Sequence, residues 1–83
     1  MHRIPRDLSG RDLCRLLKRF GYEVTRQQGS HIRLEATHPN GTHRLTVPNH
    51  DPIKIGTLNH ILADVAGVIG VTKSELVDRL FHG

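Results

Sequence analysis

The stretch Tyr22–Val47, YEVTRQQGSHIRLEATHPNGTHRLTV, contains three short segments in which apolar and polar residues alternate. Alternation with a period of two is typical of strands that bury one face of a sheet. The apolar positions are Tyr22 and Val24 in the first segment, Ile32, Leu34 and Ala36 in the second, and Leu45 and Val47 in the third. The pattern therefore predicts three strands that share one apolar face.

The turn between the second and third segments predicts their register. Asn40-Gly41 is a strong signal for a two-residue hairpin turn. A turn there sets Ala36 opposite Leu45, so that apolar side chains meet on one face. It also sets Glu35 opposite Thr46 on the polar face.

The turn between the first and second segments contains Gly29-Ser30. A three-residue loop that begins at Gln28 puts Val24 across from Leu34, which keeps apolar residues together. A two-residue loop would set Val24 against Arg33 and mix the two faces, so we predict the longer loop. The second strand is then central in an antiparallel meander.

His31 begins the second strand, directly after this turn. The predicted register places it on the polar face with Gln27, Arg33 and Arg44, and roughly opposite His50. Because the other sheet face has to be covered, this polar face is the one that we expect to remain open to water.

Helical patterns flank the strands. Ser9 is a predicted N-cap, and Gly21 ends an apolar stripe that comprises Leu13, Leu16, Leu17 and Phe20. The basic residues of this segment fit either phosphate contacts or, more simply for most of them, a solvated helix face; they are Arg11, Arg15, Lys18 and Arg19. Thr57 is a predicted cap for a second helix that is broken at Gly67 and Gly70, and Thr72 with Glu75 resembles a capping box for a third.

These elements predict an α+β fold. We expect a two-layer sandwich in the order α-β-β-β-α, with an extra C-terminal helix and with the first two helices over the apolar sheet face. The chain has 83 residues, the length of one small domain. We expect residues 1–7 to form an N-terminal arm and residues 8–83 a single domain.

The composition favours an anionic partner. Twelve Lys and Arg residues against eight Asp and Glu residues give a formal charge of +4, although a basic protein without such a partner fits equally well. The single cysteine excludes an internal disulfide and favours a cytoplasmic location. No apolar run is long enough to span a membrane, so we expect no membrane partner.

The residues around His31 suit RNA cleavage. A base removes the proton of a 2′-hydroxyl, an acid protonates the leaving oxygen, and cations stabilise the charge on phosphorus. Histidine serves as base or acid near neutral pH, and Arg33 lies on the same face ~7 Å away. Gly29 and Ser30 add backbone N–H groups and a hydroxyl. A histidine on a polar strand face is more often merely solvated, so this pattern alone leaves both interpretations open.

Other candidate sites are weaker. His38 and His43 flank the Asn-Gly turn, but nothing supplies a third metal ligand of a suitable kind, so we expect no metal and no other cofactor. Cys14 lies beside the first helical stripe and is interpreted as a small core residue. Ser30 and His31 are adjacent on a strand and point to opposite faces, which excludes a nucleophile–base pair.

Taken together, the motifs resemble the HicA (YcfA-like) toxins of bacterial and archaeal toxin–antitoxin pairs. The resemblance covers roughly Leu8 to Gly67 and rests on an ordered set of motifs, which are Leu16-Leu17 with Gly21-Tyr22, Arg26-x-x-Gly29-Ser30-His31, Val47-Pro48-x-His50, and Ile55-Gly56-Thr57-Leu58 with Ile61-Leu62. The chain departs from the family pattern at Ile32, where another histidine is frequent, and at Ala63–Gly67.

The resemblance implies a fold like that of double-stranded-RNA-binding domains, metal-independent cleavage of mRNA, and inhibition by a HicB-like antitoxin. It also implies that His31 is the catalytic histidine. Gly29, Ser30 and His50 are the predicted supporting residues. The predicted RNA contacts are Arg33, Arg44 and Lys54.

Two other functions fit the same fold. A binding module would hold structured RNA without cutting it, and an adaptor would use its basic face only for a protein partner. Toxicity on expression separates the toxin from both alternatives, and retention of RNA on a filter separates the binding module from the adaptor.

Overall fold

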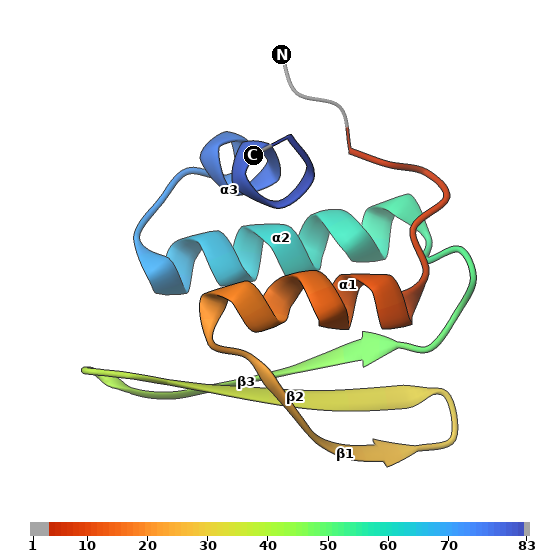
Figure 1. The fold of residues 1–83 in the computed structure, drawn as a ribbon, viewed down its shortest axis with the longest axis horizontal. Helices are drawn as coiled ribbons and strands as arrows, with labels where there is room; N and C mark the ends of the chain where they lie inside the picture. The colour runs from red at the N-terminus through yellow and green to blue at the C-terminus, as the bar shows by residue number, and fades with distance from the viewer. Residues whose placement is uncertain (1–3, 83) are drawn as a thin grey trace. The chain divides into compact units, whose positions relative to one another are not determined.

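A computed structural model describes residues 4–82 (Figure 1). The elements in chain order are α1 (Gly10–Leu17), a 3-10 turn η1 (Lys18–Phe20), β1 (Glu23–Gln28), β2 (His31–His38), β3 (Gly41–Pro48), α2 (Ile55–Ile69) and α3 (Lys73–Phe81). This arrangement confirms the predicted α+β class. Residues 1–3 of the predicted N-terminal arm lie outside the described residues.

The chain divides into two compact units. One comprises residues 7–53, with α1, η1 and the three strands, and the other comprises residues 4–6 and 54–82, with α2 and α3. The assignment of residues 8–83 to a single domain stays a prediction, as does the cover that α2 was expected to give the sheet.

Helix α1 begins where the sequence predicts, but it ends at Leu17, and the predicted stop at Gly21 ends the 3-10 turn η1 that follows it. The Ser9 hydroxyl oxygen accepts a hydrogen bond from the Asp12 N–H at 3.1 Å, which satisfies one of the unpaired donors of the first turn. After η1, Gly21 adopts a left-handed conformation with φ of 87°, which is easy for glycine and ends the helical stretch.

The three strands form one antiparallel sheet in the order β1-β2-β3, which confirms the predicted meander with β2 central. Along β2, residues alternate between exposed and buried positions. The buried apolar residues of this sheet face are Ile32, Leu34, Ala36, Leu45 and Val47. Figure 1 shows α1 lying over this face.

The predicted register of β2 and β3 is wrong by two residues. The turn residues are Pro39 and Asn40, His38 pairs with Gly41, and Leu34 pairs with Leu45. An Asn-Gly turn of type I′ needs positive φ at both central residues, but no described residue other than glycine has positive φ. A shift of two residues preserves the faces, which is why the division into buried and exposed side chains is correct.

The predicted loop between β1 and β2 is also wrong. Gln28 pairs with His31, so the loop has two residues, Gly29 and Ser30. The pairing of Val24 with Leu34 is nevertheless correct, because the register shifts between Val24 and Arg26. Such a bulge inserts one extra residue into one strand and changes the face on which the following side chains lie.

In the second unit, α2 begins earlier than predicted, since its N-cap is Lys54 rather than Thr57. It continues through Gly67, but it ends at Gly70 as predicted, where Gly70 is the C-cap with φ of 77°. Gly67 lies inside the helix because a single glycine only weakens a helix. The third helix begins as predicted, since the Thr72 hydroxyl accepts from the Glu75 N–H at 3.0 Å.

Among residues 4–82, no single helix is long and apolar enough to cross a membrane. The helices α2 and α3 meet that criterion only as a pair with a bend of 104°.

Gly10→Ala is expected to destabilise the unit that contains the sheet. A Cβ atom on Gly10 would clash with the Pro48 carbonyl oxygen, and the backbone shift that relieves such overpacking costs ~1–3 kcal/mol. Gly67→Ala is the matched control, because a Cβ there meets nothing within 4 Å and alanine is favoured over glycine inside a helix by ~0.5–1 kcal/mol. Thermal unfolding should show a lower midpoint for the first variant only; equal midpoints would contradict the close approach.

Candidate functional site

His31 is the first residue of the central strand and lies on the open face of the sheet. Its side chain is exposed, whereas Ile32 beside it is buried. Within residues 7–53, α1 packs on the opposite face. The placement of His31 on the polar face therefore agrees with the sequence prediction.

The turn before His31 is held at two points. Gly29 adopts φ of 58°, a left-handed conformation that other residues adopt with strain. The Ser30 carbonyl accepts a hydrogen bond from the Asn49 N–H at 2.7 Å. Since Pro48, which is opposite His31, has no N–H to donate, this bond continues the contact between the strands one residue further on. The backbone around His31 is therefore hydrogen-bonded to β1 on one side and to the end of β3 on the other.

Three polar side chains neighbour His31 on the open face. Gln28 lies directly opposite it on β1, and Arg33 lies two residues further along β2, ~7 Å away. Arg26 lies directly opposite Arg33, and directly paired residues share one sheet face. Neither Arg26 nor Gln28 was predicted as a site residue, although Arg26 belongs to the motif Arg26-x-x-Gly29-Ser30-His31, because uninterrupted alternation assigns Gln27 to this face instead.

Arg44 is also on the open face, but it is already paired. It lies opposite Glu35 in the register, and its Nε atom is 3.3 Å from a Glu35 carboxylate oxygen. Both side chains are substantially exposed, so the ion pair contributes little stability. It does offset part of the charge that Arg44 would offer to a phosphate.

His50 does not lie opposite His31, as the sequence register had suggested. It follows the end of β3, it is exposed, and its carbonyl accepts a hydrogen bond from the Gly10 N–H at 2.9 Å. Lys54 is exposed at the N-cap of α2 and belongs to the other compact unit. The supporting role of His50 and the RNA contact of Lys54 stay predictions.

His38 and His43 lie on the apolar side of the sheet. His43 Nδ1 and the Tyr22 hydroxyl are 2.7 Å apart and share a hydrogen bond, and both imidazoles contact the buried Tyr22 ring edge-on. No group of three His, Cys, Asp or Glu side chains suited to a metal ion is found in residues 4–82. These two histidines are therefore part of the packing around Tyr22.

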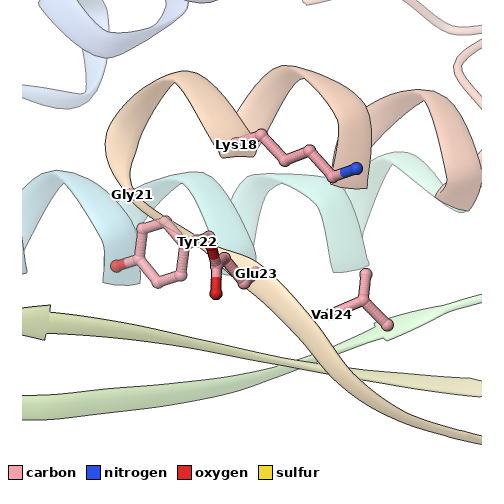
Figure 2. A pocket seen from close by; sticks show the side chains of 5 residues that line it. All are labelled: Lys18, Gly21, Tyr22, Glu23 and Val24. Atoms are coloured by element: carbon pink, nitrogen blue, oxygen red, sulfur yellow. The ribbon is translucent and has the colours of Figure 1, made fainter.

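A hollow of about 360 Å³ lies at the beginning of β1 (Figure 2). Its lining residues are Lys18, Gly21, Tyr22, Glu23 and Val24. None of the predicted site residues lines it, so the candidate site is an open surface rather than this hollow.

Cys14, which the sequence predicts as a core residue, is buried. Burial raises the pKa of its thiol, and the nearby Lys18 partly opposes this shift. The protonated thiol is a poor nucleophile.

Comparison with protein families identifies the family of this chain. The family model described as the HicA toxin of bacterial toxin–antitoxin systems matches residues 10–67. No curated protein and no solved structure matches the chain, so the likeness to double-stranded-RNA-binding domains stays a prediction. Because the matched region covers most of the chain, from the first residue of α1 into α2, this protein belongs to the HicA toxin family and is the toxin of a toxin–antitoxin system.

Proposed function

We propose that this toxin is an endoribonuclease that cleaves mRNA, with His31 as its general acid or base. The observation that carries the proposal is the position of His31, which is exposed on the open face of the sheet with Arg33 beside it. A phosphate at this face would meet an imidazole, which can act as general acid or base, and a cation that neutralises charge.

The proposed reaction uses the RNA itself as the nucleophile. The 2′-oxygen forms a bond to the adjacent phosphorus while the bond from phosphorus to the 5′-oxygen breaks. The 2′-hydroxyl proton passes to a base, and the leaving 5′-oxygen receives a proton from an acid. The products are a 2′,3′-cyclic phosphate and a free 5′-hydroxyl. His31 performs one of the two proton transfers.

The remaining predicted residues take the roles that their positions suit. Gly29 and Ser30 shape the turn that presents His31, and His50 is the proposed supporting residue from the end of β3. The proposed RNA contacts are Arg33, Arg44 and Lys54. Of the two that lie on the sheet, Arg33 is the stronger candidate, because Arg44 is paired with Glu35.

The partner that we propose is an acidic, HicB-like antitoxin that covers His31 in the cytoplasm. Membership of the HicA toxin family implies an antitoxin partner, and its acidity, its likeness to HicB and its position over His31 are proposed. The chain carries a formal charge of +4, so an acidic partner would associate faster through electrostatic steering. Simple occlusion would suffice, since the site is an open surface.

The purified chain is expected to cut a long RNA transcript at an unchanged rate when a chelator is present. The proposed proton transfers use side chains, and the nucleophile belongs to the RNA. The matched control is single-stranded DNA of the same sequence, which lacks the 2′-hydroxyl and should remain intact. Cleavage that stops with chelator, or that cuts the DNA equally, would overturn the proposed mechanism.

The second candidate function is RNA binding without cleavage. The open face of the sheet carries the cations Arg26 and Arg33. These would attract RNA whether or not His31 is catalytic, which favours this second function. In that case the transcript is retained on a filter with the protein but stays at full length.

A further inference from the structure

The bulge in β1 decides which side chains accompany His31. Without it, Val24 and Arg26 would share a face, since residues two apart on a strand do. The register shift between them puts Val24 opposite Leu34 on the apolar side and Arg26 opposite Arg33 on the open side. The Thr25 hydroxyl, at the bulge, donates a hydrogen bond to the Arg33 carbonyl at 3.4 Å.

The result is a pair of like charges at neighbouring positions. Directly paired residues have Cβ atoms ~4.5–5.5 Å apart, and like charges in this arrangement repel. Neither guanidinium has an ion-pair partner among residues 4–82. Further along the same face Glu35 lies opposite Glu23 on β1 and opposite Arg44 on β3, and it pairs with Arg44. The two arginines without an ion pair therefore lie between these carboxylates and His31.

We propose that Arg26 and Arg33 together hold the phosphate on which His31 acts. An anion between the two guanidinium groups would relieve their repulsion, and the planar fork of arginine matches the oxygens of a phosphate. Arg33 reaches the site from the strand of His31, and Arg26 reaches it from β1, next to Gln28 opposite His31. This inference rests on the proposed function for the identity of the phosphate, which is that of RNA.

The first test uses inorganic phosphate and needs no catalysis. The melting temperature of the intact chain is measured in phosphate and in chloride at equal ionic strength, for the wild type, Arg26→Gln, Arg33→Gln and Arg11→Gln. Arg11 is an exposed residue of α1 and controls for the loss of one charge. Phosphate should raise the melting temperature of the wild type and Arg11→Gln more than that of the other two. An equal response of all four proteins would overturn the proposal that Arg26 and Arg33 hold one phosphate between them, an arrangement called the arginine clamp below.

The second test measures RNA affinity. Arg26→Gln and Arg33→Gln should each weaken binding by roughly 10-fold or more, as expected for loss of a hydrogen bond to a charged group. Each should also reduce the slope of affinity against salt by about one. If both residues hold the same phosphate, the double variant loses less than the product of the two single losses. If the affinity loss of the double variant equals the product of the two single losses, Arg26 and Arg33 contact separate phosphates, which contradicts the clamp.

The two proposals fail in different ways. A wild-type chain that binds phosphate through these arginines but never cuts RNA would refute the proposed nuclease and retain the anion site. A wild-type chain that cuts RNA, while Arg26→Gln cuts it equally fast and responds equally to phosphate, would refute the clamp and retain the nuclease.

Discussion

His31→Ala is expected to lower the rate of RNA cleavage by at least ~10²-fold, the scale of a lost general acid or base. The variant should keep its fold, because His31 is exposed and contributes little to packing. It should also keep most of its RNA affinity, because the arginine and lysine side chains supply the attraction to phosphate. The measurements are circular dichroism, RNA binding and cleavage of a long transcript.

The matched control is His60→Ala, which removes an exposed histidine from α2 and should leave cleavage at the wild-type rate. His50→Ala should reduce cleavage by a smaller factor than His31→Ala if His50 has the proposed supporting role. A His31→Ala protein that is folded, binds RNA and still cuts at the wild-type rate would remove His31 from the mechanism.

Tyr22→Ala is expected to destabilise the unit of residues 7–53 by ~3–5 kcal/mol, as large-to-small replacements of buried aromatic residues do. The Tyr22 side chain is 0% exposed and contacts both His38 and His43. Small domains are stable by only ~5–15 kcal/mol, so a substantial fraction of the variant should be unfolded on mild heating. Urea unfolding measures the loss.

Tyr22→Phe separates packing from hydrogen bonding at this position. It keeps the ring and removes the hydrogen bond to His43 Nδ1, a change of ~1 kcal/mol. Val24→Ala, at a neighbouring position that is 44% exposed, should cost less than Tyr22→Ala. If Tyr22→Ala and Tyr22→Phe unfold at the same urea concentration, the ring is not a central part of this core.

The sequence predicted those features that depend on neighbours along the chain. Ser9 and Thr72 cap their helices as expected, because a capping hydroxyl bonds to an N–H only three residues away. Gly21 ends the first helical stretch through its own left-handed conformation. His31 and Arg33 lie on the open face because alternation along a strand follows from backbone geometry alone.

The composition of the site depended on pairing between strands, which alternation does not specify. The turn at Pro39-Asn40 rather than Asn40-Gly41 sets Pro48, not His50, opposite His31. The bulge between Val24 and Arg26 makes two features compatible. The turn after β1 has only two residues, and Val24 nevertheless pairs with Leu34 on the apolar side.

The order of the helices and strands, the apolar face of the sheet and the placement of His31 on the open face therefore follow from local patterns along the chain. The pairing of Arg26 with Arg33 across the strands, and the ion pair of Arg44 with Glu35, follow only from how the strands associate. A register is a relation between two strands. Its energy depends on how turns, bulges and cross-strand contacts fit together, and several registers satisfy the same alternating pattern.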